Sequence, residues 1–169
     1  MLCMIVFLVL GGLVTYGIHW FQSWRHQPTE ARRLAEAASV VGFVRTAIID
    51  VSDGDNPPHA TAFFIGPAPK PDALAVVSVP TIKLSPLEPP PYMSELEKKK
   101  YDDSDFAVAY GKRPDGCGAG VAFISNPKQW EYSLRGQHMI EVISPEQIES
   151  VRRGASVFME LAIGNCGWQ

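Results

Sequence analysis

The chain has 169 residues with 15 basic and 18 acidic side chains, which gives a formal net charge of -3 at pH 7. Binding to nucleic acid needs a concentrated positive surface. The one basic run, Lys98 to Lys100, has acidic residues close on both sides and is typical of a solvated helix end. Composition and charge therefore argue against a nucleic-acid partner.

The first 24 residues form an apolar run that ends in a cluster of aromatic side chains. No side chain from Leu2 to Ile18 is charged, and Trp20 and Phe21 extend the run to the ~20 residues that a helix needs to cross a membrane. Aromatic side chains followed by Arg25 are typical of a membrane–water boundary. A cleaved signal peptide would have a basic start and a small-residue cleavage site, and this run has neither. We predict that residues 1–24 form a single transmembrane anchor.

The orientation of this anchor is left open by two conflicting indications. Arg25, Arg32 and Arg33 follow the span, and the excess of basic residues on the cytoplasmic side of membrane proteins would keep the domain in the cytoplasm. Against that rule, we expect a small protein with one N-terminal span to export the domain that follows. We therefore predict a single-pass protein of a bacterial inner membrane with a periplasmic domain.

Cysteine usage allows one disulfide in the domain. Cys3 belongs to the predicted anchor, so Cys117 and Cys166 are the only plausible pair. In an oxidising compartment their bridge would tie the C-terminal tail to a central hairpin, whereas in a cytoplasm both would stay thiols. Neither cysteine has a histidine at a spacing that suits zinc. The bridge and the free thiols remain alternatives at this point.

A short helix is expected directly after the anchor. Thr29 is a good N-cap, the following residues are strong helix formers, and Gly42 is a suitable end. The apolar side chains of this helix are small and form a modest stripe. Residues 25–42 are therefore expected to form a stalk that rests on the domain or leads to it from the membrane.

Three strands are predicted next, at 43–51, 59–66 and 73–79. The third is an almost continuous apolar run, which indicates burial on both faces of a sheet. Residues 52–58 between the first two strands carry acids and glycine, but prolines interrupt the spacing that a calcium loop requires, so a plain turn is expected.

The middle of the chain is expected to hold a connector, a short helix and a hairpin. Pro80 to Pro91 is rich in proline and predicts an extended connector, followed by a helix over 92–101. Apolar strands at 105–110 and 120–125 flank a turn at Pro114-Asp115-Gly116. The glycine-rich turn resembles an anion-binding loop, but it leads into a strand rather than a helix, which favours a hairpin.

The last third of the chain is expected to end in a long helix. Residues 130–134 and 138–143 favour two strands, with a short helix around 129–134 as the alternative. Ser144 to Gln147 form a capping box with proline at the first helical position. Apolar residues then recur at helical spacing: Ile148, Val151, Ala155, Phe158 and Leu161 or Ala162. Gly154 is expected to weaken this helix or bend it.

These elements predict an α+β fold in which an N-terminal transmembrane helix precedes one domain with a mainly antiparallel sheet packed by a C-terminal helix. The predicted organisation is an anchor at 1–24, a stalk or linker helix at 25–42 and a single domain at 43–169. After the anchor, the chain is long enough for one domain of ordinary size and too short for two.

No catalytic, cofactor-binding or metal-binding residues are assigned from the sequence. A hydrolase would need Cys117 exposed, with His59 or His138 within hydrogen-bonding distance of it. Lone histidines such as these are more often surface residues of strands. Three carboxylates could pair as acid and base, but spacing in the sequence does not bring them together: Asp50, Glu131 and Glu141.

The function predicted from these features is a membrane-anchored, non-enzymatic protein-binding module of a bacterial envelope assembly, acting as a subunit or adaptor. Such a module would offer a sheet edge, a groove or its proline-rich arm to a protein partner, and no cofactor or small-molecule ligand is expected. One alternative is an immunity protein that neutralises a toxin at the envelope. A second alternative is a small hydrolase that uses Cys117 or a histidine.

Overall fold

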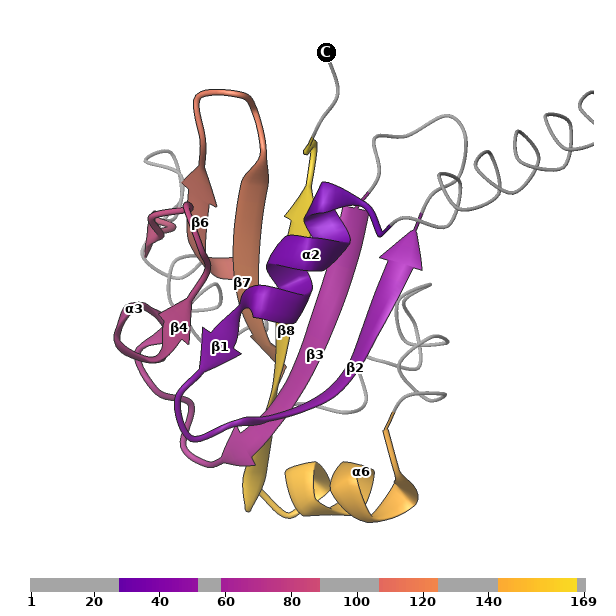
Figure 1. Ribbon diagram of the computed structural model, residues 1–169. Helices are drawn as coiled ribbons and strands as arrows, with labels where there is room; N and C mark the ends of the chain where they lie inside the picture. Colours follow the sequence, from indigo (N-terminus) through magenta and orange to yellow (C-terminus); the bar gives the residue numbers. More distant parts are fainter. Residues whose placement is uncertain (1–27, 52–58, 89–106, 125–142, 167–169) are drawn as a thin grey trace, which may run out of the picture.

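The computed structural model describes residues 28–51, 59–88, 107–124 and 143–166. Their centre is a six-stranded sheet in the order β2-β3-β8-β7-β6-β5, in which all neighbours are antiparallel (Figure 1). The strand bounds are β2 Val44–Val51, β3 His59–Pro67, β5 Ser85–Pro86, β6 Ala107–Lys112, β7 Gly118–Ile124 and β8 Ser156–Gly164. The predicted α+β class and mainly antiparallel sheet are confirmed.

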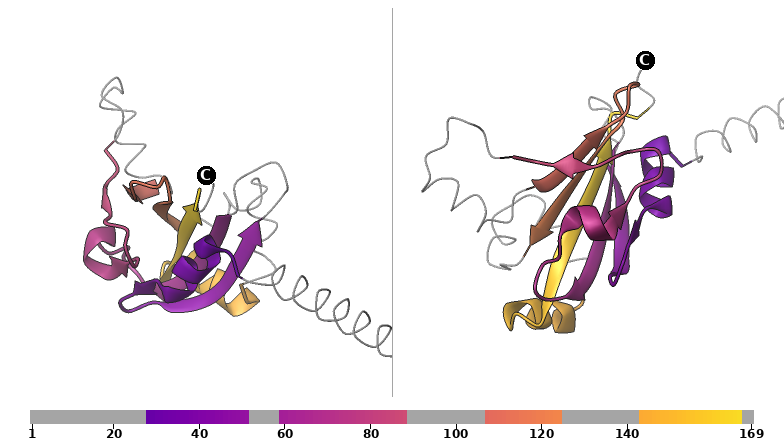
Figure 2. Two further views of the ribbon diagram at one scale, coloured as in Figure 1. Left: turned by 45° about the horizontal axis from the view of Figure 1, so that its top comes forward. Right: turned by 90° about the vertical axis from the view of Figure 1, so that its left-hand side faces the viewer.

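Helix α2 (Glu30–Ala37) lies on one face of this sheet, over β3 and β8 (Figures 1 and 2). Thr29 caps it as predicted, because its hydroxyl oxygen accepts a hydrogen bond from the backbone N–H of Arg32 at 3.1 Å. The helix ends at Ala37, before the predicted end at Gly42. The chain becomes extended there because β1 (Ser39–Val40) pairs with β4 (Val77–Ser78).

Two groups of buried apolar side chains lie on opposite faces of the sheet. The first group packs under α2, where the small side chains of Ala60 and Ala62 are fully buried, and it also includes Phe64, Val121, Phe123, Met159, Leu161 and Ile163. The second group lies toward α6 (Pro145–Arg152) and contains Phe63, Ile124, Ile143, Val151 and Phe158. Each strand of the central pair β3 and β8 therefore contributes side chains to both cores.

The C-terminal helix is much shorter than predicted. Its capping box is present, since the Ser144 hydroxyl accepts from the N–H of Gln147 at 3.3 Å and the Gln147 side chain accepts from the N–H of Ser144 at 2.9 Å. The helix nevertheless ends at Arg152, Gly154 adopts a φ of 68°, and the residues predicted to continue the helix form β8. An apolar run buried on both sides fits a central strand as well as a helix, and pairing with both β3 and β7 decides between them.

The prediction of a strand over 73–79 is also wrong for its first half. Ala73–Val76 form the short helix α3, which Asp72 caps by accepting from the N–H of Leu74 at 3.0 Å. Leu74 is 41% exposed, so the run is not buried on both faces. The Asp72 cap favours a helix where the apolar pattern favours a strand, and only Val77–Ser78, near the end of the run, pair as β4.

Other predictions are confirmed by the described residues. Strands β2 and β3 and the hairpin of β6 and β7 lie close to their predicted positions. Of the two alternatives left open for Cys117 and Cys166, the structure has the disulfide, with an S–S distance of 2.00 Å. Predictions for 1–24, 52–58, 92–101 and 130–142 fall outside the described residues. Within the described ranges, no helix has the length and apolar character needed to span a membrane.

Candidate functional site

The outer side of β2 is an open edge of the sheet. Among the described residues, β3 is the only strand paired with β2, so the opposite side of this eight-residue strand has no ladder partner (Figure 1). Backbone N–H and C=O groups on such a side are available to pair with another extended chain. A bulge between Arg45 and Ala47 interrupts the strand near its start, and the Thr46 hydroxyl donates to the carbonyl oxygen of Phe63 at 3.3 Å.

The charged side chains of β2 lie on the face that α2 covers. The Arg45 guanidinium carbon lies 5.3 Å from the centroid of the Phe64 ring, and Nη2 donates to the carbonyl oxygen of Ala38 at 2.5 Å. The Asp50 carboxylate accepts from Nη1 of Arg32 at 2.9 Å. This contact is the main cause of a raised pKa for Arg32. Both charges are thus held at the edge without being buried.

Apolar side chains accompany the charges along the same edge. Ile48 packs against the core under α2, whereas Ala47 and Ile49 pack against the second core on the other face. Val41 is 71% exposed and Val44 is 69% exposed, which makes them the most exposed large apolar side chains among the described residues. The open edge therefore begins beside apolar surface that the domain itself leaves uncovered.

The opposite edge of the sheet is closed to pairing. Strand β5 has only two residues, of which Pro86 lacks a backbone N–H. The next residue, Leu87, donates its N–H inward to the carbonyl oxygen of Val108 at 3.1 Å. A short strand with proline is a recognised way of blocking addition of a further strand.

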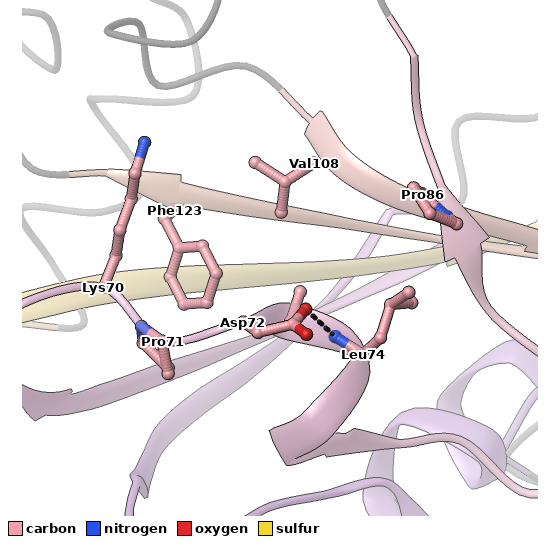
Figure 3. A pocket seen from close by; sticks show the side chains of 8 residues that line it. Lys70, Pro71, Asp72, Leu74, Pro86, Val108 and Phe123 are labelled. Atoms are coloured by element: carbon pink, nitrogen blue, oxygen red, sulfur yellow. Dashed lines mark hydrogen bonds between the residues drawn. The ribbon is translucent and has the colours of Figure 1, made fainter.

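A cleft of about 380 Å³ lies between the loop that leads into α3 and the strands β5, β6 and β7 (Figure 3). Phe123 and Val108 contribute to it from the sheet, and Leu74 contributes from α3. The Lys70 ammonium points away, while the Asp72 carboxylate is occupied by capping α3. The described residues that line the cleft include no histidine, cysteine or serine, so its chemistry suits apolar contact rather than catalysis.

A smaller hollow of about 230 Å³ lies on the face opposite α2 and is lined by His59, Tyr110 and several glycines. A β-carbon added to Gly118 would lie 2.7 Å from the Tyr110 hydroxyl oxygen. The tyrosine ring packs across the strand over this glycine, so a side chain at position 118 would displace the exposed end of the ring. Packing within the sheet therefore accounts for the glycines that line this hollow, and no ligand is needed to explain them.

The candidate residues for hydrolysis that the structure describes, Cys117, His59 and Asp50, are not brought together. Cys117 is fully buried in the core under α2 and bonded to Cys166, whereas His59 lines the hollow on the opposite face. Asp50 lies at the β2 edge. Three further candidates fall outside the described residues: Glu131, His138 and Glu141. A cysteine in a disulfide is no nucleophile, since the thiolate is the reactive form.

Arg113, which the sequence places near a glycine-rich turn, has a structural role. Its guanidinium donates to Glu30 of α2 at 2.7 Å and also contacts Asp115 in its own turn. The contact with Arg113 is the main cause of a lowered pKa for Asp115. The guanidinium therefore fastens the start of α2 to the tip of the β6–β7 hairpin, and its charge is already compensated by two carboxylates.

Comparison with known proteins adds no functional assignment. No protein-family model matches the sequence, and no curated protein or solved structure is significantly similar to it. A sheet edge was one of the docking surfaces expected from the sequence, but it could not be assigned to β2, because strand order depends on long-range pairing. The charged residues at its two ends, Arg45 and Asp50, were visible only as the two charges of a predicted strand.

Proposed function

We propose that this protein is a non-enzymatic binding module that accepts an extended segment of a protein partner along the open edge of β2. In this proposal residues 1–24 hold it in the bacterial inner membrane and the domain lies in the periplasm. The observation that carries the proposal is that one side of the eight-residue strand β2 has no partner strand within residues 28–51, 59–88, 107–124 and 143–166. Strand addition to such an edge supplies affinity through main-chain hydrogen bonds.

The contrast with the other edge supports this assignment. At the β5 edge, a proline prevents the pairing of a further strand. The β2 edge has no such residue, since β2 contains no proline over its whole length. Its bulge affects only the start, and Ala47 to Val51 pair with β3 in regular register beyond it. Exposed Val44 gives an incoming segment an apolar contact at one end.

The disulfide supports the proposed location. Structural disulfides form and persist in oxidising compartments such as the periplasm and are rare in the cytoplasm. The Cys117–Cys166 bridge joins a hairpin turn to the residues after β8 and is buried. This observation favours export of the domain over the cytoplasmic orientation indicated by the arginines that follow residue 24.

Site-specific photocrosslinking in intact cells tests the proposal. A photoreactive amino acid replaces Val44 at the open edge in the full chain, and the matched control carries it at Leu87, which is exposed beside β5. We expect one dominant adduct from position 44 and none from position 87. In the isolated complex, β2 amides should exchange hydrogen more slowly than in the free protein, because added ladder bonds protect them.

Equal adducts at both positions, or unchanged exchange of β2 amides in the complex, would contradict strand addition. The identity of the adduct also separates the predicted alternatives. A toxin that is encoded beside this protein and blocked by it would select the immunity function. A structural protein of the envelope, or this chain itself, would select a subunit or adaptor.

A further inference from the structure

We propose that the segment accepted by the open edge is β2 of a second copy of this chain, so that two sheets join into one across a two-fold axis at Ile48. This inference rests on the proposed function, because it requires β2 to be a docking edge. It goes further by naming the partner, the register and the side chains that meet.

The first step is the placement of side chains on the two faces of β2. Ile48 packs against the core under α2, Asp50 bonds to Arg32 of α2, and Arg45 lies over Phe64 of the same core. Arg45, Ile48 and Asp50 therefore share one face. Ala47 and Ile49 pack against the second core and belong to the other face.

The second step is the spacing that the bulge creates. In a regular strand, the same-face neighbours of Ile48 are two residues away on either side. Asp50 holds that place in one direction. In the other direction the bulge inserts one extra residue between Arg45 and Ala47, so Arg45 holds the equivalent place. The positive and negative side chains are thus equally far from Ile48 along the strand.

The third step is the effect of a two-fold axis through Ile48, perpendicular to the sheet. Antiparallel pairing about this axis places Arg45 of each copy opposite Asp50 of the other, which gives two cross-strand pairs of opposite charge. On the other face it places Ala47 opposite Ile49. Opposite charges and apolar pairs directly across a ladder are both stabilising. The edge is therefore complementary to itself, as a two-fold interface requires.

The same axis is compatible with attachment of both copies to one membrane. Within one copy, α2 lies on one face of the sheet (Figure 2). A rotation about an axis perpendicular to the sheet therefore leaves both α2 helices, and the two helix starts at Glu30, on the same face of the joined sheet. Charges at a strand edge often prevent association, but in this register like charges do not meet.

Cysteine crosslinking of the full chain tests the register. In a Cys3→Ser background, Ile48→Cys places two thiols opposite each other at about 5 Å between β-carbons. The control is Val44→Cys, which is more exposed but whose two copies would lie roughly 20 Å apart. We expect mild oxidation in detergent to crosslink the Ile48→Cys protein several-fold more than the Val44→Cys protein.

Charge reversal provides a second measurement that does not depend on a thiol at the interface. Arg45→Glu alone and Asp50→Lys alone should each raise the dissociation constant of the dimer roughly ten-fold, since each creates two like-charge pairs. An equimolar mixture of the two variants should regain dimers, because both pairs are then of opposite sign. Arg33→Glu, a reversal of an exposed charge on α2, is the matched control. Melting curves confirm that each variant is folded.

The outcomes separate this inference from the proposed function. Preferential crosslinking at position 48 together with regained dimers in the mixture supports both. Stronger crosslinking at position 44, or no recovery in the mixture, overturns the proposed register. A protein that sediments as a monomer up to about 1 mM while position 44 captures another protein in cells overturns the second copy and leaves strand addition standing. A monomer with no capture at position 44 overturns both.

Discussion

At one side of the sheet, β5 is two residues long and contains proline; at the other, β2 runs for eight residues, and among the described residues no strand pairs with its outer side. The closed side is also more strongly crosslinked to the rest of the domain. The disulfide joins the β6–β7 turn to the residues after β8, and Arg113 ties that turn to α2. At the open side, α2 is held through an exposed ion pair between Arg32 and Asp50.

This difference indicates a division of roles within one domain. Exposed ion pairs contribute little to stability, whereas a crosslink that spans a long stretch of chain contributes several kcal/mol. The closed half is therefore expected to determine the stability of the domain, while the open half presents backbone groups to another chain. Two changes test this division and a third tests where the central strand β8 begins, from the largest expected effect to the smallest.

Removal of the disulfide is expected to have the largest effect. Cys117 and Cys166 are separated by 49 residues, and a loop of that size corresponds to about 4 kcal/mol in the chain-entropy model. The Cys117→Ala/Cys166→Ala protein should lose approximately that much free energy of unfolding in a urea titration. Hydrogen exchange should show β6 and β7 losing protection before β2 and β3, because the crosslink acts on the closed half.

The control for this experiment is Cys3→Ser, which removes the remaining thiol and leaves the bridge intact. Its unfolding midpoint should match that of the unmodified chain. A double variant as stable as the parent, or uniform loss of protection across all strands, would show that the closed half does not owe its stability to the bridge.

Much of the fold was predictable because local signals and tertiary structure agree. The Thr29 cap, the strands over 43–51 and 59–66 and the turn around Asp115 all combine a local preference with the final pairing. The C-terminal prediction failed where two patterns overlap. The segment VFMELAI suits a helix by spacing, yet its burial on both faces suits a central strand, and neighbouring strands far away in the sequence decide the outcome.

Gly154→Ala tests where α6 ends and β8 begins. Strand β8 lies between the two halves of the sheet. In the predicted helix this change would stabilise the protein by up to about 1 kcal/mol. In the observed turn, Gly154 has a φ of 68°, and a β-carbon there costs about 1 kcal/mol or more. Nothing lies within 4 Å of that β-carbon, so the cost is conformational. We therefore expect a lower melting temperature.

Gly120→Ala is the matched control, because an added β-carbon would meet only Tyr110, at an ordinary distance of 3.9 Å. Its melting temperature should change much less than that of Gly154→Ala. A stabilised Gly154→Ala protein would support the longer helix and contradict the turn.

The candidate site was less predictable than the fold. Which strand lies at an edge depends on the order of all strands, and no local pattern in β2 encodes that order. The equal spacing of Arg45 and Asp50 about Ile48 also depends on the bulge, which appears only once β2 is paired with β3. Cys117 and Cys166, in contrast, could be paired by elimination, since the third cysteine lies in the predicted anchor.

The smallest predicted effect is acid sensitivity at the tip of the closed half. Hydrogen bonds from Arg113, and a weaker one from the backbone N–H of Cys117, lower the pKa of the Asp115 carboxyl below its ordinary value of 3.8. A folded-state pKa below the unfolded one contributes stability that is present above the unfolded value and is lost as pH falls through the folded value. Asp115→Asn should therefore lower the melting temperature slightly at neutral pH and have less effect at about pH 2.

The pH profile, rather than the size of the effect, identifies the cause. Glu146 also has a lowered pKa, mainly because it accepts a hydrogen bond from Ser144, and it lies at the start of α6, away from the hairpin tip. Asp115→Asn should leave the contribution of Glu146 to the acid dependence in place. The melting temperature of the variant should therefore still fall at low pH, but by less than that of the parent. Parallel profiles for the two proteins would mean that the contact of Asp115 with Arg113 does not contribute to the stability of the closed half.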